Sequence, residues 1–589
     1  MINLKSSKQD YPWYEFYKDI PKTLEYPKTS MVEVIMNSAL KYSDSCALEY
    51  FNNKITYKEM MDNIISCAKS LKTLGVKEND VVSICMPNTP ESIYMFYAVN
   101  MIGAVSNMIH PLSSEKEIEL FLKKSNSKVI LTIDINYKKV IKIINNTNVT
   151  KVIVSSAGDS LKGLKKIIYS IFTTDITKAI KKIKQVFLKA FKNREVISFE
   201  KFIKKGSNYY EDYTVSRKDE DLAVILYSGG TSGTPKGIML SNLSFNSLAY
   251  QAALMCDPAK SGESILSIMP IFHGFGLGVC IHTPLYIGMK CILIPKFKSK
   301  ELGKLIKNKK PNFLVGVPTL FEALSNAKGL KENDLSSINC IVSGGDMMTE
   351  ENYKKYNAFF EKYGSNAKIR IGYGLTEACA ATCLTPTNIH KEDSIGIPFP
   401  DVIYKIVDPE TLKEKSLLED GEICINGPSV MIGYLNEEDE TNKTLKKHKD
   451  GKIWLHTGDI GYIDKDGFIY FKSRLKRMII SSGYNIYPSY IENIINKHEY
   501  VLNSTVIGVS DKYKGQVAKA YVILKKEVKL NEEVEKEIKE HCSLYIAKYA
   551  MPKIFEFRKE LPKTLVGKIA YTVLEEEEKL REKIADNFK

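Results

Sequence analysis

A glycine-rich loop between two apolar runs, "LAVILYSGGTSGTPKGIML" at residues 222–240, constrains this chain more than any other segment. Glycine lets a backbone approach a ligand closely. The loop adds hydroxyls, N–H groups and Lys236, which together suit an anion with many oxygens. A Walker A loop is excluded, because this lysine is followed by Gly237 and a strand-like run rather than by Ser or Thr opening a helix. A flexible surface turn is the alternative. The loop predicts a strand–loop–strand phosphate site, followed by a helix with Ser241 or Asn242 as its N-cap.

Helical and strand patterns alternate over about the first 150 residues. The helical periodicity of "YKEMMDNIISCAKSLKTLGV" precedes the buried-strand pattern "DVVSICMP", and the rhythm recurs at "SKVILTID" and "VTKVIVSS". Such alternation predicts a largely parallel α/β sheet. From about residue 400 the strands become short and turn-bounded, as in "GEICING" and "IWLHTGDIGYID", and the last hundred or so residues mix helices and strands. We predict a multi-sheet α/β domain over residues 1–474, with a β-rich part at about 400–474, and an α+β domain over 475–589.

Much of the net charge of +14 is concentrated in a basic insertion at about 160–195. Residues 162–194 contain ten Lys or Arg and one acid, and no nucleic-acid motif accompanies them. We therefore expect no nucleic-acid partner. The pattern predicts an added helix packed on the domain, and a second hypothesis is a surface helix that settles on anionic lipid. Its apolar positions fall near one helical face, at Ile176, Ile180, Ile183, Phe187 and Phe191.

One stretch, residues 264–289, carries no charged side chain and is long enough to span a bilayer. Because Pro270, Gly276 and Pro284 interrupt it, we expect buried strands and loops there and no helix. The eleven cysteines include no CxxC pair and no metal-type clustering. With no signal-peptide pattern at the N-terminus, they predict a cytoplasmic protein. Peripheral contact with the inner membrane face is the alternative.

Seven further segments follow the loop in a fixed order. They are "PIFHGFGLG" (270–278), "SGGD" (343–346), "GYGLTE" (372–377), "GEICINGPSVMIGY" (421–434), "HTGD" (456–459), "SRLKRMIISSGYNIYPSYIE" (473–492) and "LPKTLVGK" (561–568). With "YSGGTSGTPKG" they resemble the signatures of the adenylate-forming enzymes, which include acyl-CoA synthetases, luciferases and the adenylation domains of peptide synthetases. The resemblance runs from about residue 30 to 575. It implies a small β-barrel subdomain within the N-terminal domain and a small, mobile C-terminal domain.

This resemblance implies a reaction in two steps. A carboxylate attacks the α-phosphate of Mg·ATP to give an acyl-adenylate and pyrophosphate, and a thiol, usually that of coenzyme A, then displaces AMP. Because two anions react, cations and hydrogen-bond donors must lie where charge develops, and the protein mainly positions the reactants. The implied cofactors are ATP, Mg²⁺ and coenzyme A.

The resemblance also implies roles for residues around the phosphates. Beside Lys236, the β- and γ-phosphates are held by the loop residues Ser228, Gly229, Gly230, Thr231, Ser232 and Gly233. Thr376 contacts the α-phosphate, and Glu377 holds Mg²⁺, a hard ion that prefers carboxylate oxygen. Lys568 bridges the substrate carboxylate and the α-phosphate.

Other implied roles concern the nucleoside, the acid and the thiol. The adenine site is formed by Gly345, Asp346, Tyr373 and Gly374, with the aspartate standing where alanine is usual. Asp459 accepts both ribose hydroxyls, and Arg474 is a second ribose or phosphate contact. His273 lines the carboxylate end of the acyl pocket. Lys476 is the hinge, and the coenzyme A tunnel is walled by Ser482, Gly483 and Tyr484.

A fatty acid is the expected substrate, because "PIFHGFGLGVCIHTPL" supplies an apolar wall opened by glycines. An aryl carboxylic acid is the second candidate, and a free-standing adenylation enzyme that loads a carrier protein is the third. An amino acid is disfavoured, since no Asp stands near Phe275 to hold an α-ammonium group. A non-catalytic nucleotide-binding relative is disfavoured because Lys568 and Glu377 are both present.

Lys568→Ala is expected to abolish acyl-adenylate formation but to leave conversion of a supplied acyl-adenylate to thioester, since this lysine acts on charge that develops in the first step. Gly483→Leu is expected to leave acyl-adenylate formation intact but to abolish thioester formation, because the leucine side chain fills the coenzyme A tunnel. Single-turnover assays of each half-reaction measure both effects. Equal slowing of both halves by Lys568→Ala in a folded protein would contradict the assignment.

Overall fold

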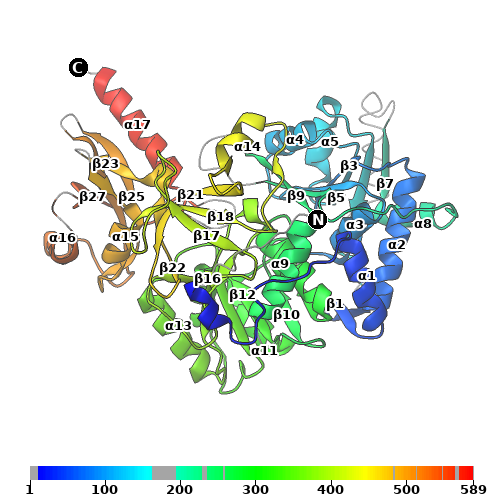
Figure 1. Ribbon diagram of the computed structural model, residues 1–589, viewed down its shortest axis with the longest axis horizontal. Coiled ribbons are helices and arrows are strands. Elements are labelled where there is room, and N and C mark those ends of the chain that lie inside the picture. The colour runs from blue at the N-terminus through cyan, green and yellow to red at the C-terminus, as the bar shows by residue number, and fades with distance from the viewer. Residues whose placement is uncertain are drawn as a thin grey trace.

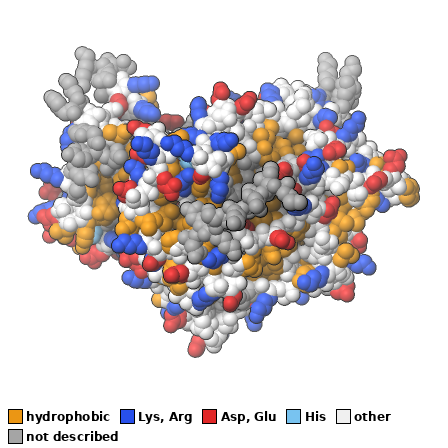
Figure 2. All heavy atoms as spheres, in the orientation of Figure 1, with side chains coloured by type: hydrophobic (Ala, Val, Ile, Leu, Met, Phe, Trp, Pro, Cys, Tyr) orange, Lys and Arg blue, Asp and Glu red, His pale blue; other side chains and the backbone are white. Residues whose placement is uncertain are grey.

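The computed structural model of this chain describes residues 11–161, 194–227, 235–256, 259–481, 484–511, 514–546, 548, 550–563 and 569–587. The basic helix expected at 162–194 therefore lies outside the described residues, apart from Arg194. Within the described ranges, no helix is both long and apolar enough to cross a membrane. Basic and acidic side chains are interspersed over the face shown in Figure 2.

The first half of the chain forms a largely parallel sheet, as the alternating pattern predicts (Figure 1). Its order is β19-β9-β8-β4-β3-β5-β6-β7. The strands are β3 (Val81–Cys85), β4 (Val105–Met108), β5 (Val129–Ile133), β6 (Lys151–Ser155), β7 (Glu195–Ser198), β8 (Leu222–Tyr227), β9 (Gly237–Ser241) and β19 (Gly433–Tyr434). The helices of this region are α1 (Met31–Lys41), α2 (Tyr57–Thr73), α3 (Pro90–Met101), α4 (Glu115–Lys124), α5 (Tyr137–Ile143), α8 (Phe199–Gly206) and α9 (Asn242–Met255).

Local sequence signals set the ends of these helices. Thr56, Thr89 and Ser114 each form a reciprocal capping box at the start of α2, α3 and α4. Ser241 caps α9 by accepting from the Ser244 N–H, and β8 and β9 pair antiparallel across the glycine-rich loop. The predicted strand–loop–strand arrangement is therefore confirmed, and of the two predicted N-caps, Ser241 and Asn242, the structure has Ser241.

A second, mixed sheet follows the order β17-β18-β21-β22-β16-β15-β14-β13-β12-β10-β11-β1-β2, with β20 on β21. The strands from β14 to β1 along this path pair parallel, whereas those from β14 to β17 pair antiparallel. The strands are β1 (Cys46–Tyr50), β2 (Asn53–Thr56), β10 (Ser264–Ser267), β11 (Lys290–Leu293), β12 (Phe313–Gly316), β13 (Cys340–Gly344), β14 (Ile369–Tyr373), β15 (Cys383–Leu384), β16 (Ser394–Pro398), β17 (Ile403–Val407), β18 (Gly421–Asn426), β20 (Leu445–Lys447), β21 (Ile453–Ile463) and β22 (Ile469–Arg474). Its α-helices are α10 (Thr283–Ile287), α11 (Leu302–Lys309), α12 (Pro318–Ser325), α13 (Glu350–Lys362) and α14 (Glu438–Thr444).

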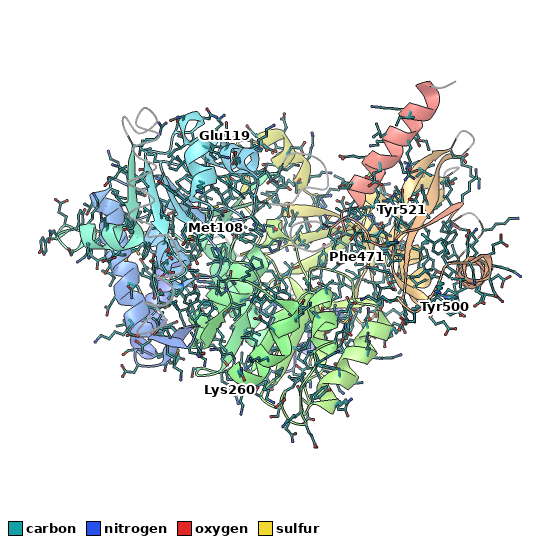
Figure 3. All side chains as sticks on the ribbon, turned by 180° about the vertical axis from the view of Figure 1, so that it is seen from behind. Met108, Glu119, Lys260, Phe471, Tyr500 and Tyr521 are labelled. Carbon is teal, nitrogen blue, oxygen red and sulfur yellow. The ribbon has the colours of Figure 1, made fainter. Side chains whose placement is uncertain are left out.

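The C-terminal residues form a smaller α+β unit at one end of the molecule, drawn orange to red in Figure 1. Figure 3 shows the same end from behind, with Tyr500 and Tyr521 labelled. The strands are β23 (Ile479–Ser481), β24 (Tyr484–Ile486), β25 (Val501–Asp511), β26 (Gly515–Leu524) and β27 (Ile554–Phe557), and the helices are α15 (Pro488–Asn496), α16 (Glu532–Tyr545) and α17 (Tyr571–Asn587). This unit has its own apolar core, as an independent small domain requires. The α/β fold class with a small C-terminal domain is confirmed.

The expectation that residues 264–289 contain no helix is wrong. After β10, Phe275–His282 form a π-helix that continues directly into α10. Pro284 lies inside this continuous helical run and lacks an N–H to donate. The Cys280 carbonyl, four residues before it, accepts from the Ser267 hydroxyl at 2.9 Å instead. Gly276 marks a close backbone contact, because a Cβ there would lie 2.0 Å from the carbonyl oxygen of Pro270. Proline and glycine serve the packing here and do not break the helix.

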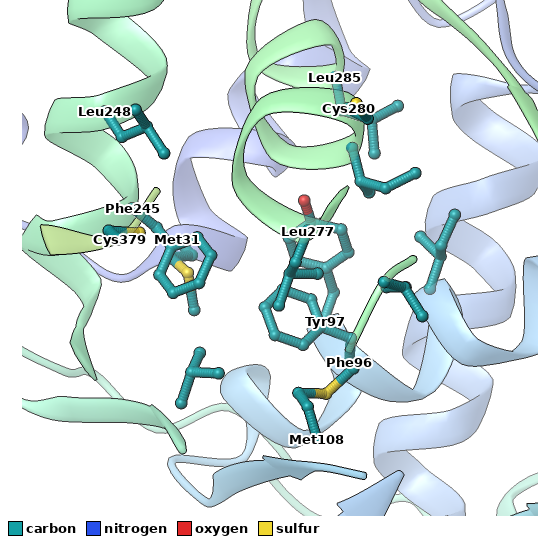
Figure 4. Close-up of a cluster of buried hydrophobic side chains, with 14 of the residues drawn as sticks. Met31, Phe96, Tyr97, Met108, Phe245, Leu248, Leu277, Cys280, Leu285 and Cys379 are labelled. Carbon is teal, nitrogen blue, oxygen red and sulfur yellow. The ribbon is translucent and has the colours of Figure 1, made fainter. Parts of the chain in front are cut away.

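This helical segment lies at the centre of the main core (Figure 4). Leu277 and Cys280 are fully buried and belong to the same apolar cluster as Phe96 of α3 and Leu248 of α9. Burial lowers the pKa of the fully buried His282 to about 3, so the ring is neutral at physiological pH. Its two nitrogens are 3.0 Å from the Tyr97 hydroxyl and 3.1 Å from the amide oxygen of Asn246, which satisfies this buried polar group.

Gly276→Ala is expected to lower the thermal midpoint measurably, because overpacking against backbone costs about 1–3 kcal/mol. Gly508→Ala is the matched control, since its added Cβ would meet only the movable side chains of Ile479 and Gln516, at 3.2–3.4 Å. Differential scanning calorimetry of both variants makes the comparison. A midpoint for Gly276→Ala that equals the control would refute the packing argument.

Candidate active site

A continuous cleft of about 1510 Å³ runs between the two large sheets and the C-terminal unit. Figure 3 labels two of its lining residues, Met108 on β4 and Phe471 on β22, which lie on different parts of the molecule. Residues predicted from six separate motifs line this one cleft, namely Lys236, His273, Gly345, Asp346, Tyr373, Gly374, Thr376, Glu377, Asp459 and Arg474. The fold therefore brings together residues that are up to 238 positions apart in the sequence, from Lys236 to Arg474.

Asp459 is a buried carboxylate of the cleft with two side-chain partners. Its side chain is 2% exposed; the Tyr373 hydroxyl donates to Oδ2 at 2.6 Å, and Arg474 Nε lies 3.2 Å from Oδ1. The antiparallel register of β21 and β22 places Asp459 opposite Arg474. Burial and the neighbouring Asp459 carboxylate raise the pKa of Tyr373 well above its usual value. The phenol therefore stays protonated and keeps donating.

A second row of hydrogen bonds holds the turn before Asp459. The Asp459 N–H donates to Thr457 Oγ1 at 3.1 Å, and the Thr457 hydroxyl donates to the Ile423 carbonyl at 2.7 Å. Gly458 adopts a φ of 69°, and its N–H donates to Glu422 Oε1 at 3.0 Å. Neighbouring strand β18 thus fixes the backbone that carries the Asp459 carboxylate.

The turn that carries Thr376 and Glu377 is strained. Cys379 has a φ of 61° and Ala380 a φ of 130°, conformations that cost free energy in residues with a Cβ. Gly374 makes room for this turn, since a Cβ there would lie 1.5 Å from the Ala380 carbonyl oxygen. Gly274 of the preceding motif also lies close to this turn, because a Cβ added to it would be 3.0 Å from the Cys379 carbonyl oxygen. The glycines of "HGFGLG" and "GYGLTE" thus pack against one strained turn.

Glu377 lies at the centre of this arrangement. The Tyr434 hydroxyl donates to its Oε1 at 3.0 Å, and its carbonyl accepts from the Met431 N–H at 2.8 Å. Burial raises the pKa of Glu377. A buried carboxylate whose charge is disfavoured by desolvation fits a hard cation such as Mg²⁺, because the ion would restore the charged form.

Lys236 is held by partners that the motif did not indicate. Its Nζ donates to Glu440 Oε2 of α14 at 2.5 Å and lies 4.7 Å from the centroid of the Tyr434 ring. The hydrogen bonds from Lys236 and Lys443 lower the pKa of Glu440 to about 2. Tyr434 therefore contacts both Lys236 and Glu377. Sequence reasoning missed Glu440 and Tyr434, because their contacts depend on α14 and β19 packing beside Lys236.

His273 lies at the other end of the cleft, in front of the π-helix. Its Nδ1 accepts from the Phe275 N–H at 3.2 Å. The neighbouring Phe272 ring lies 4.0 Å from the ring of His110, between centroids. Burial lowers the pKa of His110 to about 4. His110 also lines the cleft, and no motif had pointed to it.

Several predicted site residues lie outside the described residues. These are Ser228, Gly229, Gly230, Thr231, Ser232, Gly233, Ser482, Gly483 and Lys568. For Lys476 and Tyr484 the structure gives the backbone, in the 3-10 turn Leu475–Arg477 and in β24, but no side-chain environment. Lys563 and Ile569, which flank the segment containing Lys568, both line the cleft.

The chain on either side of Lys476 is fixed to two different parts of the molecule. Arg474 pairs with Asp459 of β21. Arg477 donates to Glu492 Oε1 at 2.5 Å and to the Val506 carbonyl at 3.0 Å, and its guanidinium lies 4.4 Å from the centroid of the Tyr571 ring. These partners of Arg477 all belong to the C-terminal unit.

Comparison with known proteins agrees with the geometry of the cleft. Residues 36–435 match the family described as "AMP-binding enzyme", and residues 490–568 match "AMP-binding enzyme C-terminal domain". A long-chain-fatty-acid–CoA ligase of Bacillus subtilis is 35% identical over 577 residues, covering 96% of this chain and 98% of that protein. A long-chain-fatty-acid–CoA ligase of Yersinia pestis is 31% identical over 579 residues, with the same shares covered. The crystal structure of an anthranilate CoA ligase with anthranoyl-AMP shares the fold, with a TM-score of 0.79 and 22% identity over 96% of this chain and 99% of that one.

Lys236→Ala is expected to raise KM for ATP about ten- to hundredfold, because a charge-assisted contact to phosphate contributes about 1.5–3 kcal/mol. Lys443→Ala is the control: this lysine also pairs with Glu440, at 2.7 Å, but its side chain is 71% exposed. Steady-state kinetics with varied ATP, together with a thermal melt to verify folding, decide the matter. An unchanged KM in folded Lys236→Ala would remove this residue from the phosphate site.

Proposed function

The chain belongs to the AMP-binding enzyme family and is an AMP-forming acid–CoA ligase, and we propose that the acid it activates is a long-chain fatty acid. Its substrates are thus a carboxylic acid, ATP and coenzyme A. The family match and the CoA ligase relatives establish the class of reaction. The identity of the acid rests on the shape and chemistry of the cleft.

The observation that carries this proposal is the apolar part of the cleft beyond His273. It lies between α9, the π-helix and strands β12 and β13, and its lining includes Ala252, Phe275, Val279, Met289, Phe313 and Val342. An alkyl chain gains about 0.8 kcal/mol for each CH₂ group that it buries. A long chain therefore obtains much of its binding free energy from this wall. Relatives named as long-chain-fatty-acid–CoA ligases cover almost the whole chain and support the same substrate.

We assign the chemistry of adenylation to the residues gathered in the cleft. The substrate carboxylate enters beside His273 and attacks the α-phosphate, and pyrophosphate leaves toward Lys236 and the glycine-rich loop. Thr376 and Lys568 donate to the oxygens on which charge develops. Glu377 would hold Mg²⁺, which when bound offsets the negative charge of the phosphates. Asp459 and Arg474 fix the ribose, and Tyr373 with Gly345, Asp346 and Gly374 forms the adenine site.

We assign the second half-reaction to a different arrangement of the C-terminal unit. In it, backbone rotation at Lys476 withdraws Lys568 and brings Ser482, Gly483 and Tyr484 to the cleft, where they wall the pantetheine arm. Coenzyme A is the proposed acceptor in preference to a carrier protein. Lys476→Pro would impair this change selectively.

The proposal is tested by measuring pyrophosphate release and thioester formation with a series of saturated fatty acids and with benzoate, anthranilate and 4-coumarate. We expect the highest kcat/KM for a long-chain acid with coenzyme A present. Higher kcat/KM for an aryl acid would overturn the fatty-acid assignment and favour the aryl-acid ligase.

Val279→Phe is expected to shift this preference toward shorter chains, because the larger ring narrows the apolar part of the cleft. Val279 is half-buried, so the substitution leaves the fully buried core unchanged. We expect kcat/KM for a sixteen-carbon acid to fall about tenfold or more, the equivalent of about 1.4 kcal/mol, while that for a six-carbon acid is retained. Equal effects on both acids would place the acyl chain elsewhere.

A further inference from the structure

We propose that Cys424, His448 and His456 form a binding site for a zinc-type divalent cation, separate from the catalytic Glu377. The Cys424 sulfur and one nitrogen of each imidazole all lie within 4.8 Å of one another. The three residues come from different elements. Cys424 lies on β18, His456 on β21, and His448 directly follows β20. In the β18–β21 register Cys424 stands opposite His456.

His456 is oriented as a metal ligand would be. Its Nδ1 lies 2.7 Å from Glu422 Oε2, and both residues are buried. A carboxylate only accepts hydrogen bonds, so Nδ1 carries a proton, and in the neutral ring Nε2 then presents its lone pair. A carboxylate on the outer nitrogen is the arrangement that fixes the tautomer of zinc-binding histidines.

His448 faces that lone pair. Its Nε2 lies 2.9 Å from His456 Nε2. One N–H···N hydrogen bond joins the two rings in the metal-free protein, and with a neutral His456 ring its donor is His448. The ring of His448 is held by stacking on Trp454, at 5.8 Å between centroids and 28° between planes. Trp454 in turn donates to Asp450 at 3.0 Å. When His448 carries its proton on Nδ1 instead, both Nε2 lone pairs point at a shared position.

The buried thiol of Cys424 completes the set of ligands. Zn–N bonds of about 2.0–2.1 Å and Zn–S bonds of about 2.3 Å place tetrahedral ligand atoms about 3.3–3.7 Å apart. The two imidazole nitrogens are 2.9 Å apart and the sulfur lies within 4.8 Å of both, so an ion would move the two rings slightly apart. Binding would release the thiol proton to solvent, and water would take the fourth position. Sulfur and imidazole ligands favour zinc over Mg²⁺, so the ion that accompanies ATP would not fill this site.

Such an ion would act on the structure around the nucleotide. Glu422 contacts His456 through Oε2 and accepts the Gly458 N–H through Oε1. Gly458 directly precedes Asp459. A cation bound between β18, β21 and the turn after β20 would therefore brace the strands that hold this carboxylate.

The test is binding of Zn²⁺ and of Co²⁺, as a spectroscopic probe, to the full-length chain without nucleotide. We expect one tight Zn²⁺ equivalent in competition with a chromophoric chelator, and a Co²⁺ spectrum with intense tetrahedral bands and a thiolate charge-transfer band. Cys424→Ser is expected to abolish the charge-transfer band. Glu422→Gln is expected to weaken Zn²⁺ binding about 10- to 100-fold, as loss of an outer carboxylate does.

Matched variants separate this site from the other histidines and cysteines of the chain. His448→Gln removes a half-buried ligand at a turn. This variant still tests the site if the buried Cys424→Ser substitution prevents folding. His390→Gln removes a half-buried histidine that pairs with Glu350, and Cys46→Ser removes a half-buried cysteine. Neither control should alter metal binding. Equal Zn²⁺ affinity in the wild-type protein and in folded His448→Gln, or a Co²⁺ spectrum without a thiolate band, would overturn the proposal.

Discussion

The arrangement of the cleft depends on one backbone contact, the approach of Gly374 to the Ala380 carbonyl. No side chain larger than hydrogen fits there, because a Cβ would lie 1.5 Å from that oxygen. The contact closes the strained turn that directs Thr376 and Glu377 into the cleft. It also fixes the end of β14, from which Tyr373 reaches Asp459 on the antiparallel strands. The close packing at Gly374 therefore positions the end of the parallel strand β14 against the antiparallel strands that carry Asp459.

The sequence predicted the fold class and most of the described cleft because the motifs occur where strands and turns end. Ligands of α/β folds bind at such ends, so Tyr373, Glu377 and Asp459 meet although far apart in sequence. Contacts between side chains of separate elements could not be predicted. Glu440 opposite Lys236 has no motif of its own. The helix at 275–287 was missed because glycine and proline were interpreted as breakers without knowledge of what packs on them.

Two neighbouring parts of the second sheet, which share strand β21, offer different kinds of cation ligand. Around Glu377 and Asp459 the groups are carboxylates and hydroxyls, which suit hard ions and sugar hydroxyls. A few residues away, Cys424 and His456 offer sulfur and nitrogen, which suit softer metals. The second group does not match a metal-binding sequence motif, because its members are far apart in sequence. His448 follows Cys424 by 24 positions and His456 follows it by 32, and only the folding of the chain brings them together.

The anchors on either side of Lys476 set a mechanical limit. Arg474 belongs to the large body and Arg477 to the small one, so only Leu475 and Lys476 lie between the two attachments. Each of these residues contributes two soft dihedrals, and the Cα atoms of the two arginines can never be more than about 11 Å apart. Any reorientation is then a swing about a nearly fixed pivot. In such a rotation, groups far from the pivot are displaced much further than groups beside it. A different set of side chains from the small body can therefore face the cleft while the two bodies stay attached to each other.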